Sequence, residues 1–523
     1  MRVKWLWSGI LLWIAAIVFA GCNSDNTSWN GESKHGSGNV LTIGTASSIE
    51  SFDPHNNNNT SSEAILVNMF DYLLKNDSNQ RKIPVLATSW QQTDDNIWRF
   101  HLRHGVTFQN GDPFTSADVK FTLDRVAKDT TLRQNRYFNK IIEVRIIDDY
   151  TVDIVTDGPD PLLLNRLSKI GAGMLPSAYI ATEGMDAFLQ KPIGTGPYAF
   201  GQWLKNDRVE LVRNDHYFGG KPKWDRVVFC ELPNAATRVA ELLAGHIDIA
   251  TDIPARDIKR IEHMAGKTIV KAPIQRVLQI ILRTASGNAT ANPKVRAAID
   301  FAIDKQKLVD SVAGGAGVVT RTSVTPGNFG ADPGLYGHSL YDAQRAKRLL
   351  QEAGYRSGGP AIQLSVSSAY EQYAQMVTSM LDQVGFQTTL EVLEPNAFNK
   401  RYSSRSFKEA FMIGIGNSLF DASNNFTRYL KAIAVGETDY NNPKVEQLLQ
   451  AAAINLNPIT RDKQYEQVQQ ILAQDRPAIY LFQMEGVYGV DQRIIFAPRR
   501  DEMFYADDIV LASSSQVSNA QNE

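Results

Sequence analysis

The sequence predicts an α/β protein, and three observations support this fold class. Strand-like and helix-like segments alternate along most of the 523 residues, an order that is typical of α/β folds. Residues 40–44 (VLTIG) and 98–103 (WRFHLR) alternate their side chains as half-buried strands do. Two segments that begin at Asn292 and Asn442 space their apolar side chains as helices do.

The first elements follow in a consistent order. The segment at 40–44 ends in glycine and opens the folded part of the chain. The segment at 98–103 is followed by an Asn-Gly pair, which signals a turn. A helix is expected to begin after Thr115, because Thr115 and Asp118 have the spacing of a capping box. The buried face of this helix would carry Val119, Leu123 and Val126.

Three later helices have recognisable starts. Asn292 and Asn442 are each followed by proline; Asn is a good N-cap, and proline fits the first helical position. A third helix is expected from Asp342, its cap, to Gly354, which ends it. The apolar positions of the three helices are Val295, Ala298, Ile299, Ala302 and Ile303; Val445, Leu448, Leu449 and Ala452; and Ala346, Leu349, Leu350 and Ala353.

The N-terminus has the layout of an export signal. Arg2 and Lys4 precede an apolar run without charges that ends at residue 21. Cys22 follows two small residues, and Ala-Gly-Cys resembles a bacterial lipobox, in which the cysteine sulfur carries a lipid. The alternative is a secreted protein, or one with an uncleaved anchor, in which Cys22 has no role. Residues 23–39 are polar and rich in Gly, Ser and Asn, which predicts a flexible tether.

The composition and the absence of catalytic motifs narrow the possible functions, and the absence of motifs shifts the weight toward binding. Lys and Arg number 54 against 56 Asp and Glu, so no basic excess points to nucleic acid. After Cys22 only Cys230 remains, so no internal disulfide or cysteine-based metal site is possible; its apolar surroundings predict a buried, inert thiol. His101 and His104 would lie on opposite faces of a strand. No catalytic motif, metal site or cofactor site is indicated.

Several segments together resemble the large extracytoplasmic solute-binding proteins of peptide and nickel ABC importers. Their order and spacing match this family through most of the chain. The matching segments are 83–90 (IPVLATSW), 102–119 (LRHGVTFQNGDPFTSADV), 192–198 (PIGTGPY), 213–220 (RNDHYFGG), 236–249 (ATRVAELLAGHIDI), 294–304 (KVRAAIDFAID) and the helix after Tyr341. Most of these segments are turns or core helices, so they identify a fold and do not mark a ligand site.

The resemblance implies a two-lobe periplasmic-binding-protein fold, class II or cluster C-like, with an extra subdomain in the first lobe. A ligand would be caught between the lobes as they close. The expected division is a signal peptide (1–21), a lipid-anchored tether (22–39), lobe I (40–60, 177–280 and 483–523, the last with a C-terminal tail), the extra subdomain (61–176) and lobe II (281–482).

The resemblance also implies ligand-binding residues. A peptide carries an ammonium group, and an acidic side chain is its natural partner in a closed cleft. In peptide-binding relatives, an Asp that follows a run similar to W-x-x-D-x-x-D-P in the second lobe has this role. The matching segment here is 414–422 (GIGNSLFDA), in which Asp421 aligns with that Asp. The alternative is a loop Asp that caps the next helix. The backbone before Asp421 is expected to pair with a peptide as an added strand, which brings in Gly414, Ile415, Gly416, Asn417 and Ser418.

The partner of a ligand carboxylate has one weaker candidate. Dipeptide-binding relatives carry an Arg soon after the strand that matches residues 362–366, and this chain has none there. Arg283, in the expected hinge strand, is an alternative anchor; the other interpretation is an exposed side chain or a hinge salt bridge. Tyr370 and Phe420 are expected to pack on ligand side chains or, alternatively, to belong to the core.

The implied function is that of a lipid-anchored, monomeric receptor outside the cytoplasm, in the periplasmic space or at the cell surface. It would deliver short peptides to the permease and ATPase of an ABC importer, without covalent chemistry and without nucleic acid as a partner. The alternative within the family is a different solute: a nickel chelate, haem, glutathione or an oligosaccharide. The missing Arg and the altered run at Ser418 keep this alternative open.

Overall fold

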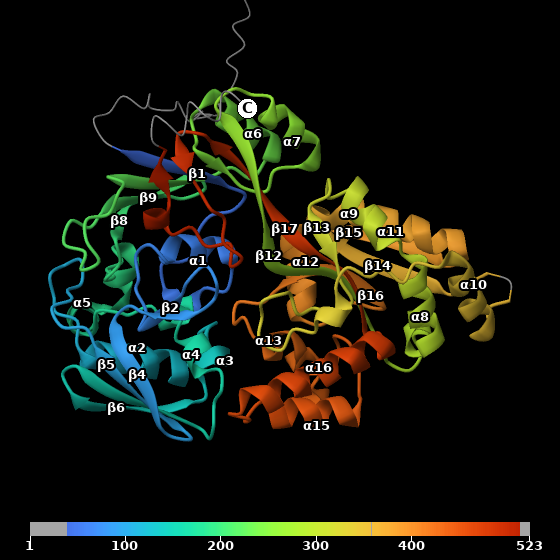
Figure 1. The fold of residues 1–523 in the computed structure, drawn as a ribbon, viewed down its shortest axis with the longest axis horizontal. Coiled ribbons are helices and arrows are strands. Elements are labelled where there is room, and N and C mark those ends of the chain that lie inside the picture. The colour runs from blue at the N-terminus through green and yellow to red at the C-terminus, as the bar shows by residue number, and fades with distance from the viewer. Residues whose placement is uncertain (1–38, 357, 513–523) are drawn as a thin grey trace, which may run out of the picture. The chain divides into compact units, whose positions relative to one another are not determined.

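The computed structural model describes residues 39–356 and 358–512 (Figure 1). The predicted signal peptide, Cys22 and residues 23–38 of the tether lie outside the described residues. Helices and strands alternate along the described chain, which confirms the α/β class. None of the helices that the structure describes is both long enough and apolar enough to cross a membrane.

The first lobe is built on one half of a sheet of eleven strands. Its strands follow the order β17-β11-β1-β10-β9-β8, and β1 lies parallel to β10 and β11. β1 (Val40–Thr45) confirms the predicted opening strand. The other elements are β8 (Tyr198–Leu204), β9 (Arg208–Arg213), β10 (Arg226–Glu231), β11 (Ile249–Ala250), α1 (Thr60–Leu66), α5 (Ser177–Gln190), α6 (Ala235–Ala244) and α7 (Ala255–Glu262).

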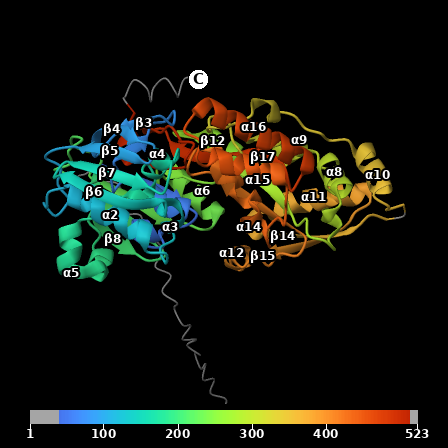
Figure 2. The same cartoon turned by 90° about the horizontal axis from the view of Figure 1, so that it is seen from below.

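A separate four-stranded antiparallel sheet lies within the range predicted for the extra subdomain. Its strands follow the order β4-β5-β7-β6, and α2 (Ser116–Lys128) packs on β6 (Figure 2). The capping box of Thr115 and Asp118 is present as predicted. The strands and short elements here are β2 (Leu74–Asn76), β3 (Lys82–Pro84), β4 (Ala87–Asp94), β5 (Ile97–Leu102), β6 (Ile141–Asp148), β7 (Thr151–Thr156), α3 (Asn135–Phe138) and α4 (Leu163–Arg166).

The second lobe carries the other half of the large sheet, in the order β15-β14-β16-β12-β17 with β13 beside β17. Asn292, Asp342 and Asn442 cap their helices as predicted. The elements are β13 (Gly317–Val319), β14 (Ala361–Ser367), β15 (Gln387–Leu393), β16 (Ala410–Gly416), α8 (Pro293–Ala302), α9 (Lys305–Ser311), α10 (Ala343–Glu352), α11 (Glu371–Val384), α12 (Pro395–Ser403), α13 (Ala422–Phe426), α14 (Lys431–Ala434), α15 (Pro443–Ala452) and α16 (Pro458–Asp475).

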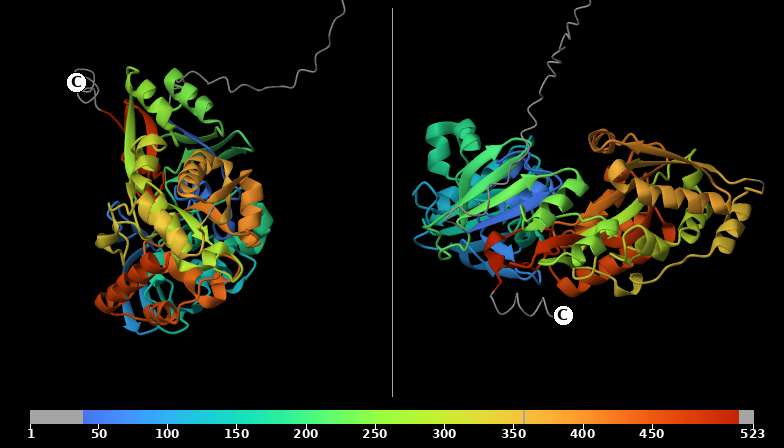
Figure 3. Two further views of the ribbon diagram at one scale, coloured as in Figure 1. Left: turned by 90° about the vertical axis from the view of Figure 1, so that its right-hand side faces the viewer. Right: turned by 90° about the horizontal axis from the view of Figure 1, so that it is seen from above.

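Two long antiparallel strands, β12 (Lys267–Leu282) and β17 (Ala478–Asp491), join the two halves of the sheet (Figures 1 and 3). Their pairing is interrupted between Pro273 and Val277, where the register shifts. An interruption of this kind bends and twists a ladder locally. The interruption lies a few residues before the lobe boundary expected at residue 280, and the exact division of the lobes stays a prediction.

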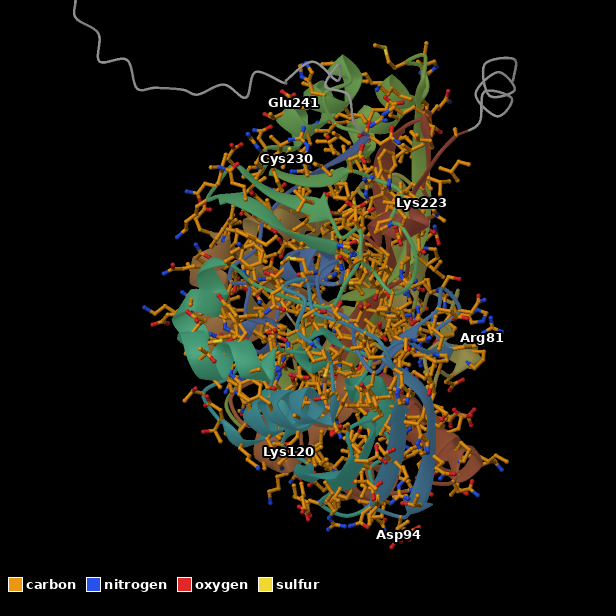
Figure 4. The ribbon with its side chains drawn as sticks, turned by 90° about the vertical axis from the view of Figure 1, so that its left-hand side faces the viewer. Arg81, Asp94, Lys120, Lys223, Cys230 and Glu241 are labelled. Carbon is orange, nitrogen blue, oxygen red and sulfur yellow. The ribbon has the colours of Figure 1, made fainter. Side chains whose placement is uncertain are left out.

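Cys230 lies on β10 in the core of the first lobe (Figure 4). Its side chain is buried, and burial raises the pKa of the thiol to about 12. A thiol with so high a pKa is almost entirely protonated at neutral pH and is a poor nucleophile. The prediction of a buried cysteine is confirmed, and the raised pKa agrees with an inert thiol.

The glycines of residues 192–198 let two segments of the first lobe approach closely. A Cβ atom on Gly194 would lie 2.0 Å from the carbonyl oxygen of Met69, a separation that no side chain tolerates. Between these glycines, the Thr195 hydroxyl donates a hydrogen bond to the Asp71 carboxylate at 3.2 Å. Asp71 is buried, and its second oxygen accepts from the Tyr217 hydroxyl at 3.3 Å.

Asp71→Asn is expected to change how stability depends on pH. Burial raises the pKa of Asp71 to about 6, although Lys75 and Arg103 act in the opposite direction. Because this folded pKa exceeds the unfolded value, its stabilising effect is complete below about pH 4 and is lost as the pH rises through about 6. Between about pH 4 and pH 6, the free energy of unfolding of the wild type should fall by about 3 kcal/mol relative to that of the variant. Denaturant unfolding of both proteins from pH 4 to 8 measures the difference, and parallel curves would contradict it.

Candidate functional site

Two cavities lie between the segments of the first lobe and those of the second. The larger, of about 810 Å³, is lined by Ser47, Arg238 and Asp252 from lobe I and by Tyr370 and Tyr373 from lobe II, among others. The smaller, of about 260 Å³, lies between residues 58–60 and residues 416–420. Thr60, Arg276 and Glu502 line both cavities, so the two meet at these side chains. The larger volume is in the range usual for small-molecule ligands.

The smaller cavity includes four of the residues predicted for the ligand site: Gly416, Asn417, Ser418 and Phe420. Asn417 is 3 % exposed, and its side chain shapes the loop that follows β16. Its amide donates to the Asp421 carbonyl at 2.9 Å, and its oxygen accepts from the Leu419 amide at 3.1 Å. These bonds fix the wall of the cavity that lobe II provides.

Three residues that line the cavities hold a left-handed backbone conformation. They are Asp252, Phe420 and Glu502, with φ of 51°, 54° and 64°. Residues other than glycine rarely adopt this conformation, and such strain gathers at functional sites. At Phe420 the loop is held in place because the Phe329 amide donates to the Phe420 carbonyl at 3.0 Å.

The end of β16 has one open edge in the described part of the chain. Its pairing with β14 stops at Met412, whereas its pairing with β12 continues to Gly416. Gly414 and Ile415 therefore lie in a stretch with a sheet neighbour on one side only, and both are half-buried. An edge of this kind has the hydrogen-bonding groups that an added strand needs.

Asp421 forms a closed ion pair with Arg461. The Arg461 guanidinium donates to both carboxylate oxygens, at 2.6 and 2.8 Å. The two side chains are only 3 % and 4 % exposed. Asp421 also caps α13, because its carboxylate accepts from the Ser423 amide at 3.0 Å. Asp421 is absent from the described residues that line the two cavities, and its role as the ammonium partner stays a prediction.

Tyr370 and Arg283 lie in different surroundings. Tyr370 lines the larger cavity, and its hydroxyl lies against the backbone of Gly414. Arg283 forms an ion pair with Asp439 and donates to the Phe407 carbonyl at 2.6 Å. It is absent from the described lining of both cavities. Its role as a carboxylate anchor is a prediction that the contacts leave untested.

Sequence reasoning missed two charged residues where the cavities meet, Arg276 and Glu502. Arg276 lies in a strand that is otherwise strongly apolar, IQRVLQIIL, and a lone charge in such a run is the signal that was available. Glu502 follows in a C-terminal segment without a regular pattern. The smaller cavity also contains Lys169 and Glu63, a buried ion pair at 2.7 Å.

No group of three or more His, Cys, Asp or Glu side chains among the described residues has a spacing that fits a metal ion.

The described chain therefore forms two lobes that share one sheet, with cavities between them. The chain matches the bacterial extracellular solute-binding proteins, family 5, over residues 82–436, and it belongs to this family. This is the class of protein that serves ABC importers.

Known relatives and solved structures agree with this assignment. The chain is 28 % identical to the glutathione-binding protein GsiB of Escherichia coli (strain K12) over 464 residues, which cover 84 % of this chain and 88 % of that protein. The periplasmic binding protein DppA of Helicobacter pylori, in complex with the peptide STSA, has a TM-score of 0.78 at 23 % identity and covers 90 % of this chain and 98 % of its own. NikA of Brucella suis, in complex with Fe(III)-EDTA, has a TM-score of 0.81 at 21 % identity, with 90 % and 100 % covered. The two-lobe fold expected from the sequence is confirmed.

Proposed function

We propose that the protein captures short peptides between its lobes and delivers them to the permease of an ABC importer. The open edge of β16, which ends at Gly416 in the lining of the smaller cavity, is the observation that carries this proposal. A peptide that lies along Gly414 and Ile415 gains backbone hydrogen bonds, and its side chains have room in the larger cavity, beside Tyr370. Binding then needs no covalent step, and the protein acts as a receptor and not as an enzyme.

The proposal also includes the localisation of the protein. Cys22 after an apolar run supports a lipid anchor that holds a monomeric receptor at a membrane outside the cytoplasm, in the periplasmic space or at the cell surface, with residues 22–39 as its lipid-anchored tether. Several acyl chains are required for stable anchoring, since one chain binds only marginally.

Glutathione is a second candidate ligand. The GsiB relatives are named for binding it, and they match 84 % of this chain. Glutathione is itself a short peptide, so the same cavities and the same polar lining suit it.

Native mass spectrometry of the full-length protein, purified from membranes in detergent, tests the proposed function. The protein is measured as isolated, then after mixing with a pool of di- to pentapeptides and, separately, with glutathione. We expect a bound peptide with a free N-terminus, retained through desalting. A retained metal chelate, haem or sugar with no retained peptide would contradict the peptide proposal.

A further inference from the structure

Arg276 occupies an unusual position in the strand that joins the two lobes. It lies in the stretch where the pairing of β12 with β17 is interrupted, and it pairs in register with Gly416 of β16. Its side chain lines both cavities. Because this strand belongs to both lobes, a charged group on it can contact a ligand whichever lobe moves.

The hydrogen bonds of Arg276 are long, and its contact with Glu502 involves only one carboxylate oxygen. Its guanidinium donates to the Gly414 carbonyl and the Thr60 hydroxyl, each at 3.3 Å, and to one Glu502 oxygen at 3.2 Å. Charge-assisted hydrogen bonds are usually about 2.7–2.9 Å, and the strongest arginine pairs are bidentate. The Arg461 pair with Asp421 meets both conditions, whereas the Arg276 pair with Glu502 meets neither.

The ion pair of Arg276 with Glu502 is partly exposed. The Glu502 side chain is 24 % exposed and that of Arg276 is 25 % exposed, against 3 % and 4 % for the Asp421 and Arg461 pair. The Glu502 backbone is held in the left-handed conformation described above. Because Glu502 lines both cavities, it has space to turn away from Arg276.

The residue before Arg276 on β12 has a donor without a partner in the described part of the chain. Gln275 lines the smaller cavity and is 4 % exposed, and its amide nitrogen has no hydrogen-bond partner among the described residues. Its amide oxygen already accepts from the Thr325 hydroxyl. A buried donor without a partner is costly unless a ligand or water supplies an acceptor.

We propose that Arg276 anchors a carboxylate of the ligand, with Gln275 as a second donor, and that Glu502 holds this position until the ligand displaces it. The ligand class is then a solute with a free carboxylate placed where the two cavities meet. This inference rests on the proposed function, since it names the group by which the captured solute is held. It replaces the Arg that dipeptide-binding relatives carry after the strand matching residues 362–366.

Two matched peptide pools test the anchor on the full-length protein in detergent. One pool has free C-terminal carboxylates, and the other has the same sequences as C-terminal amides. The wild type should retain the carboxylate pool at least about tenfold better, and Arg276→Gln should abolish that preference, because a neutral amide cannot form the charge-assisted hydrogen bonds of a guanidinium with a carboxylate. Arg145→Gln, an exposed arginine paired with Glu143, is the control and should leave binding unchanged.

Glu502→Gln should change the affinity for the carboxylate pool in the opposite direction to Arg276→Gln. This second test does not depend on whether Arg276→Gln folds. It removes the competing carboxylate and keeps the anchor, so affinity for the carboxylate pool should rise about threefold or more. Lower or unchanged affinity would overturn the displacement. Equal retention of both pools by the wild type would overturn the anchor alone, whereas retention of neither pool would overturn the peptide function and the anchor with it.

Discussion

Asp421→Ala is expected to destabilise the protein by about 3–5 kcal/mol, the usual effect of removing one partner of a buried ion pair. Asp421 and Arg461 are almost fully buried and joined by two short hydrogen bonds. Without the carboxylate, the Arg461 charge stays buried without compensation. The α13 cap is lost as well, because the Ser423 amide loses its acceptor.

Urea unfolding of the wild type and the variant measures this effect. Glu143→Ala is the matched control, since the Glu143 pair with Arg145 is about half exposed and should contribute less than about 1 kcal/mol. Asp421→Ala combined with Arg461→Met should recover part of the loss, because no charge is then left unpaired. A loss of less than about 1 kcal/mol in Asp421→Ala would show that the ion pair is not a structural element.

The same residue is the predicted ammonium partner, and Asp421→Asn separates the two roles. The amide keeps the size of the side chain and an acceptor for the helix cap. If Asp421 binds the ammonium group, the variant should lose affinity for free-amine peptides and keep its affinity for N-acetylated ones. Affinity of the folded variant for free-amine peptides equal to that of the wild type would remove Asp421 from the ligand site.

Asp300→Ala is expected to produce a loss of similar size, about 3–5 kcal/mol. Asp300, on α8, accepts from Lys305 and from Arg476 at 2.8 Å each. The Lys305 side chain is 1 % exposed, so the substitution leaves an ammonium group buried without its partner. Arg476 lies between α16 and β17, so the three side chains fix the start of the strand that leads out of lobe II.

Thermal unfolding and acid titration both test the Asp300 cluster. Burial alone would raise the pKa of Asp300, but Lys305 and Arg476 hold it below its ordinary value. Because the folded pKa lies below the unfolded one, the stabilisation is present above about pH 4 and is lost as the pH falls through the folded value. Asp300→Asn should therefore show a weaker loss of stability in acid than the wild type. An identical acid transition would contradict the assignment.

Local signals allowed much of the fold to be predicted from the sequence. The capping box at Thr115 and the caps at Asn292 and Asn442 depend on residues within one turn, and each was found as expected. The lobe arrangement came from the family resemblance, which the structure and the relatives confirm. Periodicity alone does not indicate which half of a shared sheet a strand joins.

The candidate site was predictable only in part. The loop from Gly416 to Phe420 was expected at the ligand and lines the smaller cavity. The partners that decide the chemistry are remote in sequence: Arg461 is 40 residues from Asp421, and Glu502 is 226 residues from Arg276. No spacing rule links residues so far apart, because their contact depends on the packing of both lobes.

The order of the strands in lobe I has a consequence for the synthesis of the chain. The core of lobe I joins Leu41 and Ile43 of the first strand to Tyr488, Phe504 and Ile509 near the other end. Domains usually fold as the chain emerges, starting from the N-terminal one. Here the N-terminal lobe has no complete core until almost the last residue has been made, whereas lobe II can assemble earlier. Lobe I is therefore the last part of the described chain to become compact, although it contains the first strand.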